Sequence, residues 1–250
     1  MLQIKHSPHS LNALRKIGRR LLAATLIWIP TLGFSAEESL RPFNAMDVFD
    51  LEWVSDPQVA PDGNRVVYVR RSNDIMSDRT RSHLWRIDTD GNNHRPLLSN
   101  NDNAYSPRWS PDGNRLAFIS SSTGSSQIHV RWMDNGDVAV VTHLQSSPSN
   151  LSWSPDGRWL AFTLSVKAPT EPMVKPRSKP KGATWADKPI TVSTTRYQYD
   201  GRGIVAPSYR HVFVVPAEGG SARQLTTGNF NHSGALSWSS DSQQIFFSAY

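Results

Sequence analysis

The sequence predicts an all-β fold, a β-propeller of four-stranded blades, because a ten-residue pattern recurs at a blade-like spacing. Trp109–Phe118 and Trp153–Phe162 both read Trp-Ser-Pro-Asp-Gly followed by alternating apolar residues, and Val59–Tyr68 is an earlier copy. In a later copy, Trp238–Phe247, serines replace the proline and the glycine. The aspartates of the first three copies are 50 and 44 residues apart. Units of roughly 40–50 residues with four short strands are typical of propeller blades.

Each copy of the pattern predicts a β-hairpin. Proline sets φ at the entry of the turn, aspartate can bond to its own backbone, and glycine accepts a positive φ. In the strand that follows, Leu116 and Phe118 share one face, as do Leu160 and Phe162, because side chains alternate along a strand. We therefore expect two apolar residues of every copy to point into the core.

The repeat also divides the chain. Residues 36–54 form a lead-in segment, in which Asn44–Leu51 is predicted to be a short helix with Asn44 as its N-cap. Residues 55–250 form a partial propeller, with a polar loop at Ser72–Arg81 inside its first blade. The predicted blades span about 55–99, 105–143 and 150–227, followed by an incomplete one at 236–250.

The third blade is longer than the others, since Asp156 and Asp241 are 85 residues apart. Either a blade has lost its pattern or one blade carries an insert, and the proline-rich composition after Leu164 favours the insert. We predict an exposed loop at 164–189, followed by a β-rich segment at Ile190–Tyr199. The Lys/Pro run at 175–181 could contact an acidic partner or lipid headgroups, but a solvated, mobile loop needs no such function, and we favour that interpretation.

Residues 1–35 read as a signal peptide. Residues 1–20 contain five basic residues and no acidic ones, and the apolar run 21–29 follows. Gly33 and Ser35 are small residues suited to cleavage before Ala36. An uncleaved membrane anchor is the alternative, but the run is shorter than the roughly 20 residues of a spanning helix. The sequence thus predicts a periplasmic or secreted protein that meets the membrane only during export.

The net charge of +6 does not indicate nucleic-acid binding. Five of the 27 basic residues lie in the leader, which leaves 22 against 21 acidic residues in the rest of the chain. A nucleic-acid surface needs an excess of positive charge on the folded domain. The sequence therefore predicts no nucleic-acid partner.

Three blades and one hairpin cannot close a ring, since propellers have about four to eight blades. An open propeller would expose strand edges at both ends. We therefore expect this chain to be the N-terminal part of a longer protein.

The mature chain resembles the N-terminal propeller of the prolyl oligopeptidase family of serine peptidases, in its acylaminoacyl-peptidase and dipeptidyl-peptidase branch. The resemblance covers roughly residues 40–250. It rests on the repeated hairpins, on the long third-blade insert and on three flanking segments, Val54–Gln58, Trp185–Pro189 and Tyr199–Gly203. The hairpin pattern alone is shared with TolB-like periplasmic propellers, so a non-enzymatic binding propeller is the alternative.

The resemblance implies a C-terminal α/β-hydrolase domain that hydrolyses short peptides, with the propeller gating access of the peptide substrate. Such a domain carries its nucleophile in Gly-x-Ser-x-Gly. No such pentapeptide occurs in these 250 residues, and Gly219–Arg223 fails at its last position. We therefore assign no catalytic residue to this chain.

Other kinds of site are not indicated by the sequence. There is no cysteine, and the eight histidines form no His-x-x-x-His pair, so we expect no metal and no cofactor. Five tryptophans could stack on a carbohydrate, but their places in the repeat favour packing between blades. These are Trp85, Trp109, Trp132, Trp153 and Trp238.

Overall fold

The computed structural model describes residues 41–98, 103–168, 177–186, 197–201 and 203–250, together with residues 190, 192 and 195. The predicted signal peptide at 1–35 lies outside these residues. The chain divides into two units, Met1–Pro42 and Phe43–Tyr250, and the second contains all of the strands described below. No helix among the described residues is long and apolar enough to cross a membrane.

The second unit begins with a short 3-10 helix, η1 (Ala45–Asp50), at the place where the sequence predicts a helix. Asn44 is its N-cap: the side chain accepts from the Met46 amide at 2.7 Å, and Asp47 accepts from the Asn44 amide at 2.8 Å. This reciprocal pair satisfies amides that the first turn would otherwise leave free. The apolar side chains of Val48, in this helix, and of Leu51, just after it, are both exposed.

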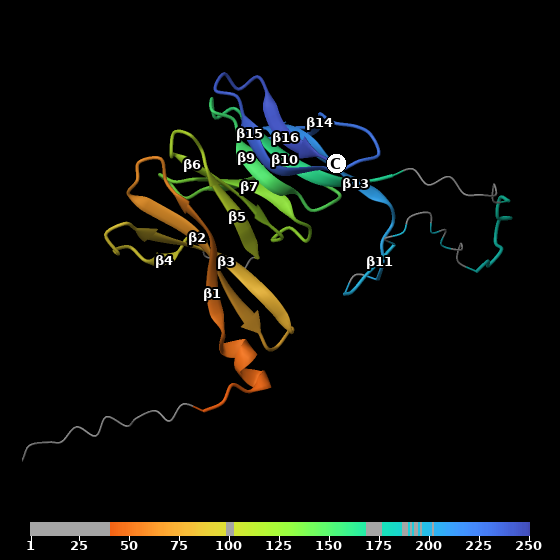
Figure 1. Cartoon of the computed structure of the whole chain (residues 1–250), viewed down its shortest axis with the longest axis horizontal. Coiled ribbons are helices and arrows are strands. Elements are labelled where there is room, and N and C mark those ends of the chain that lie inside the picture. The colour runs from red at the N-terminus through yellow and green to blue at the C-terminus, as the bar shows by residue number, and fades with distance from the viewer. Residues whose placement is uncertain are drawn as a thin grey trace, which may run out of the picture. The chain divides into compact units, whose positions relative to one another are not determined.

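Three four-stranded antiparallel sheets follow in chain order, and then a two-stranded hairpin (Figure 1). The first sheet contains β1 (Glu52–Val59), β2 (Arg65–Asp74), β3 (Arg79–Asp88) and β4 (Arg95–Pro96). The second contains β5 (Ala104–Trp109), β6 (Arg115–Ser120), β7 (Gln127–Trp132) and β8 (Val138–Val140). The third contains β9 (Ser149–Trp153), β10 (Trp159–Lys167), β13 (Ser208–Pro216) and β14 (Arg223–Gln224). The last hairpin pairs β15 (His232–Trp238) with β16 (Ile245–Ala249). These sheets confirm the predicted all-β fold of four-stranded units.

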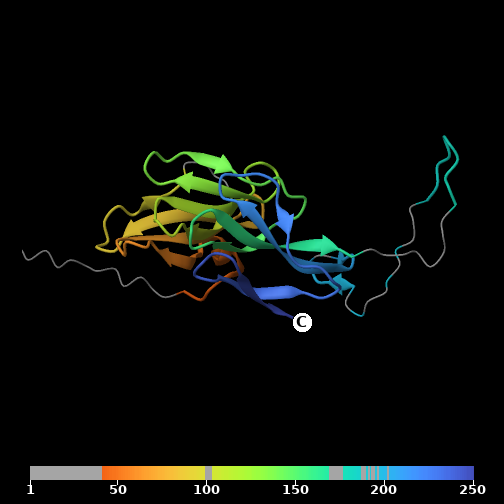
Figure 2. The ribbon, with the colours of Figure 1, turned by 90° about the horizontal axis from the view of Figure 1, so that it is seen from above.

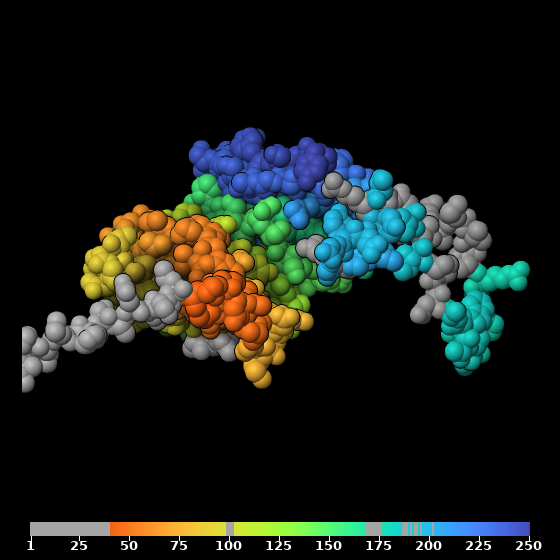
Figure 3. Space-filling view, turned by 60° about the horizontal axis from the view of Figure 1, so that its bottom comes forward, coloured from red at the N-terminus to blue at the C-terminus, as the bar shows by residue number. Residues whose placement is uncertain are grey.

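Neighbouring sheets pack face to face through apolar side chains. The first seam, between the first and second sheets, joins Val67, Val69 and Leu84 to Leu116 and Phe118. The second seam, between the second and third sheets, is larger; its buried residues are Ala117, Ile119, Ile128, Val130, Val141, Leu151, Trp153, Leu160, Phe162, Phe213, Val215 and Ala217. The last hairpin packs on the third sheet through Leu236. Its dark blue surface lies beside the green surface of the third sheet (Figure 3). The predicted alternation therefore places Leu116 and Phe118 in one seam and their neighbours Ala117 and Ile119 in the next.

Two predicted connections differ from the structure. The polar loop expected at Ser72–Arg81 is mostly strand, because β2 and β3 stay paired as far as Asp74 and Arg79. Cross-strand side-chain bonds support this polar extension: Arg81 Nη2 lies 2.6 Å from Asp74 Oδ2. Ile190–Tyr199 was expected to be β-rich, yet its described residues hold only β11 (Gln198–Tyr199), paired with β12 (Gly203–Ile204).

The insert lies between β10 and β13, which are the second and third strands of the third sheet (Figure 2). β10 continues to Lys167, so the connection begins later than the expected residue 164. Residues 177–186 contain no helix or strand, and all but Ala183 are exposed. Because β10 begins at the β9–β10 turn, the insert leaves the sheet at the other end of its strands.

Candidate functional site on the inner strands

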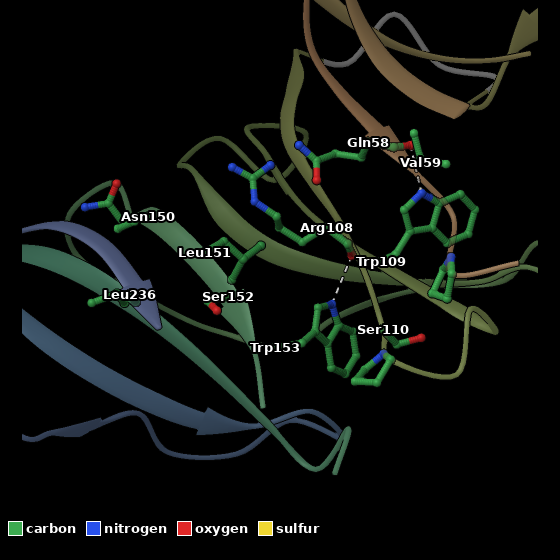
Figure 4. A pocket seen from close by; sticks show the side chains of 13 residues that line it. Gln58, Val59, Arg108, Trp109, Ser110, Asn150, Leu151, Ser152, Trp153 and Leu236 are labelled. Atoms are coloured by element: carbon green, nitrogen blue, oxygen red, sulfur yellow. Dashed lines mark hydrogen bonds between the residues drawn. The ribbon is translucent and has the colours of Figure 1, made fainter. Parts of the chain in front are cut away.

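A cavity of about 510 Å³ runs along the first strand of each sheet (Figure 4). Its walls come from β1, β5, β9 and β15 and from the turns that follow the first two. The lining residues are Gln58, Val59, Pro61, Arg108, Trp109, Ser110, Pro111, Asn150, Leu151, Ser152, Trp153, Ala235 and Leu236. The cavity is therefore built from equivalent positions of successive repeats.

A β-bulge shapes each of these strands. Asp56, Ser106 and Asn150 have φ of 51°, 55° and 52°, and each stands three residues before the Val or Trp that opens the repeat. The pairing register of β1, β5 and β9 slips at these positions. A bulge turns the side chains that precede it to a new direction. β1 begins at Glu52, before the predicted residue 55. Because its bulge interrupts the alternation of side chains, the residues before the bulge show no apolar pattern that would mark them as strand.

An ion pair crosses from β1 to β5 beside the cavity. Arg108 Nη1 lies 3.0 Å from Asp56 Oδ1 and 2.9 Å from Asp56 Oδ2. Gln58 Nε2 donates to the same carboxylate at 2.8 Å. The side chains of Arg108 and Asp56 are 31% and 28% exposed, and Arg108 lines the cavity. A guanidinium and a carboxylate held in this way can orient the polar backbone of a peptide, since the guanidinium donates several hydrogen bonds and the carboxylate accepts several.

A tryptophan ladder joins the inner strands. Trp109 Nε1 donates to the Gln58 carbonyl at 3.1 Å, and Trp153 Nε1 donates to the Arg108 carbonyl at 2.9 Å (Figure 4). The guanidinium of Arg115 lies over the Trp153 ring, 4.9 Å from its centroid. The corresponding Nε1 of Trp238 is buried and has no hydrogen-bond partner among the described residues, although the residue as a whole is half-buried. The repeat tryptophans thus pack between blades, as expected, and Trp85 differs by lying under Arg70 on its own sheet.

The repeat turns are fixed by a serine and an aspartate. Ser110 Oγ donates to Asp112 Oδ1 at 2.5 Å and accepts from the Arg115 amide at 2.9 Å. Ser154 repeats these bonds with Asp156 and the Trp159 amide. The serine hydroxyls hold the pKa of Asp112 and of Asp156 below the ordinary value of 3.8. These carboxylates are therefore structural anchors of the turns.

The site can bind and orient a ligand, and it offers no catalytic constellation. Its two hydroxyl side chains, on Ser110 and Ser152, have no histidine beside them among the described lining residues. Ser221, in the segment that nearly matches Gly-x-Ser-x-Gly, lies in the connection between β13 and β14. No group of three or more His, Cys, Asp or Glu that could hold a metal occurs in the described parts of the chain.

Of the residues that line the cavity, only Trp109 and Trp153 were considered as ligand contacts from the sequence. A usable signal was present: at the position before the repeat Val or Trp, the copies carry Gln58, Arg108, Ser152 and Ser237, although the motif around them hardly changes. Variation at one place in a constant framework is expected where a repeat contacts a ligand.

The fold is that of a β-propeller, and the first strands of its sheets line a cavity. The TolB beta propeller domain family matches residues 63–250, and the chain belongs to this family.

Curated relatives include peptidases. The "Uncharacterized peptidase YuxL" of Bacillus subtilis is 30% identical over 206 residues, which are 82% of this chain and 31% of that protein. "Dipeptidyl-peptidase 5" of Porphyromonas gingivalis is 30% identical over 43% of the chain and 16% of that protein. The "Tol-Pal system protein TolB" of Methylococcus capsulatus is 36% identical over 29% of the chain. The chain thus spans under a third of the length of the first peptidase.

Solved structures give the same fold. The uncomplexed acylaminoacyl peptidase of Pyrococcus horikoshii superposes with a TM-score of 0.54 at 17% identity, over 75% of this chain and 27% of that one.

Proposed function

We propose that this chain is the propeller part of an exported serine peptidase of the prolyl oligopeptidase family, and that its inner-strand cavity admits short peptides to a hydrolase domain. The observation that carries the proposal is the similarity to a Bacillus subtilis peptidase along 82% of the chain. The peptidase activity, its peptide substrate and its hydrolase domain are assigned to the longer protein and not to these residues.

The cavity supports the gating role by its size and polarity. A volume of about 510 Å³ falls within the range of small-molecule sites, roughly 300–1,000 Å³. Its apolar walls at Trp109, Leu151 and Trp153 adjoin the Asp56–Arg108 pair. An apolar wall with a few fixed polar groups suits a peptide, whose side chains are varied and whose backbone is polar.

Narrowing the cavity tests the gating role. In the hydrolase-containing protein, Ser152→Trp should lower kcat/KM for a peptide of several residues by about tenfold or more, because the added ring fills the passage. Labelling of the active serine by a fluorophosphonate and hydrolysis of a small ester should be unchanged. Thr123→Trp, on an exposed turn away from the cavity, is the matched control.

Two outcomes would contradict the proposal. Equal peptide kinetics for Ser152→Trp and Thr123→Trp would remove the gating role. Absence of any fluorophosphonate labelling of the complete protein would remove the peptidase itself and favour a binding propeller of the TolB kind.

Export is part of the proposal and is supported by the leader sequence alone. Mass spectrometry of the protein recovered from cells should find Ala36 as its first residue, and retention of residues 1–35 would count against a cleaved signal.

A further inference from the structure

Three arginines lie at the outer end of the first seam. Arg86 on β3 is the cross-strand partner of Val67 and of Arg95 on β4, and Arg131 on β7 is the partner of Leu116. Val67 and Leu116 belong to the core of this seam. Because cross-strand partners point to the same face, all three guanidinium groups are directed to the junction of the first and second sheets.

The positive charges at this junction are only partly balanced. Asp88 lies two residues after Arg86 on the same face, with its Oδ1 3.5 Å from Arg86 Nη2. Asp137, whose charge acts on Arg131, is exposed to solvent. Burial, followed by the charges of Arg86 and Arg95, lowers the pKa of Arg131, and Asp137 opposes this only in part. Of the three charged side chains that act on Arg131, two are positive and one is negative.

Buried polar atoms at the junction, two donors and one acceptor, also lack hydrogen-bond partners among the described residues. Arg86 Nε and Arg131 Nε are buried without a hydrogen bond to any described residue, and Asp88 Oδ1 is buried without one as well. Arg131 Nη2 lies against Gly136, where a Cβ would come within 2.8 Å of it. A buried donor without a partner is costly, and a bound anion would supply the acceptors that these two Nε–H groups lack.

The repeat provides an internal comparison. In the second seam, the positions that correspond to Arg86, Arg95 and Arg131 by strand register are Val130, Ala139 and Val215. Val130 and Val215 are fully buried there. The propeller therefore closes a seam without arginines, and blade packing does not require the three charges.

We propose that the outer end of the first seam binds a phosphate-type oxyanion through Arg86, Arg95 and Arg131. Guanidinium groups bind phosphate oxygens through paired, charge-assisted hydrogen bonds. Asp88 offsets the charge of Arg86, and the two remaining positive charges match a doubly charged anion. Arg95 is exposed, so the anion can enter from solvent.

The test is a phosphate titration of the purified full chain at constant ionic strength. Isothermal calorimetry should show one saturable site, and the melting temperature should rise with phosphate as expected for a ligand of the folded state. Arg86→Val combined with Arg131→Val copies the filling of the second seam, so it should fold and bind phosphate at least about tenfold more weakly. Arg95→Gln, at an exposed position, should weaken binding without affecting the fold.

Arg223→Val is the matched control, since Arg223 is the register equivalent of Arg95 on the third sheet and is exposed. It should keep the phosphate response of the wild type. Absence of saturable binding to the wild type would overturn the proposal. So would an equal rise in melting temperature for the wild type and the double valine variant, which would reflect general salt stabilisation. A larger response to acetate than to phosphate would overturn the assignment of the ligand class.

Discussion

The first and second seams occupy equivalent places in the repeat but are filled differently. The second seam is apolar along its length, with Val130 and Val215 fully buried at its outer end. The first seam is apolar only in its inner part and ends in Arg86 and Arg131.

Both seams keep the same inner framework. A repeat tryptophan donates to the carbonyl of the preceding blade in each, and an arginine stacks on that tryptophan: Arg65 over Trp109 and Arg115 over Trp153. The hydrogen bonds and stacking of the tryptophan ladder are thus common to both seams and hold neighbouring blades together. The residues at the outer end differ between the seams, so blade packing does not fix their identity.

Introducing an arginine into the apolar second seam should have the largest effect on stability. Val130→Arg places a guanidinium among buried apolar side chains without a carboxylate partner, and it should lower the free energy of unfolding by about 5 kcal/mol. Urea denaturation measures it. Val138→Arg, at an exposed position on the adjacent strand, is the control and should change stability by less than about 0.5 kcal/mol. If both variants unfold at the same urea concentration, the seams are not the distinct environments described above.

Removing the ladder residue of the second seam should have the next largest effect. Trp153 is 8% exposed, bonded to the Arg108 carbonyl and stacked by Arg115. Trp153→Ala should therefore lower the free energy of unfolding by about 3–4 kcal/mol. Trp109→Ala should cost less, because Trp109 is only partly buried.

Lys179→Ala provides the baseline for this series, since Lys179 is exposed in the insert. It should change stability by less than about 0.5 kcal/mol. Equal melting temperatures for Trp153→Ala and Lys179→Ala would refute the ladder.

The sequence predicts the parts of this molecule that repeat, and it misses those that depend on one blade. The turn and strand after each repeat tryptophan follow from proline, glycine and alternating apolar residues, so the blades were found. The bulges at Asp56, Ser106 and Asn150 have no local pattern, because three different residues adopt the same positive φ. The cavity and the arginine cluster arise from pairs far apart in sequence, such as Asp56 with Arg108, which only the packing of sheets brings together.

The smallest effect concerns the turns, where the first blade again differs from the next two. Ala60 stands where Ser110 and Ser154 bond their aspartates, so Ser154→Ala imitates the first blade. Loss of the Ser154 hydroxyl, which is fully buried, should lower the free energy of unfolding by about 1 kcal/mol at neutral pH.

Ser154→Ala should also raise the pKa of Asp156, because the Ser154 hydrogen bond is the main cause of the lowered pKa of this carboxyl. A carboxyl whose folded pKa is lowered contributes stability above its unfolded pKa, near 3.8, and loses that contribution as the pH falls through the folded value. The difference in stability between wild type and Ser154→Ala should therefore be largest above pH 4 and shrink on further acidification. Carbon NMR of the Asp156 carboxyl and denaturation at several pH values measure both quantities, and an unchanged Asp156 pKa in the variant would show that the serine does not control the turn.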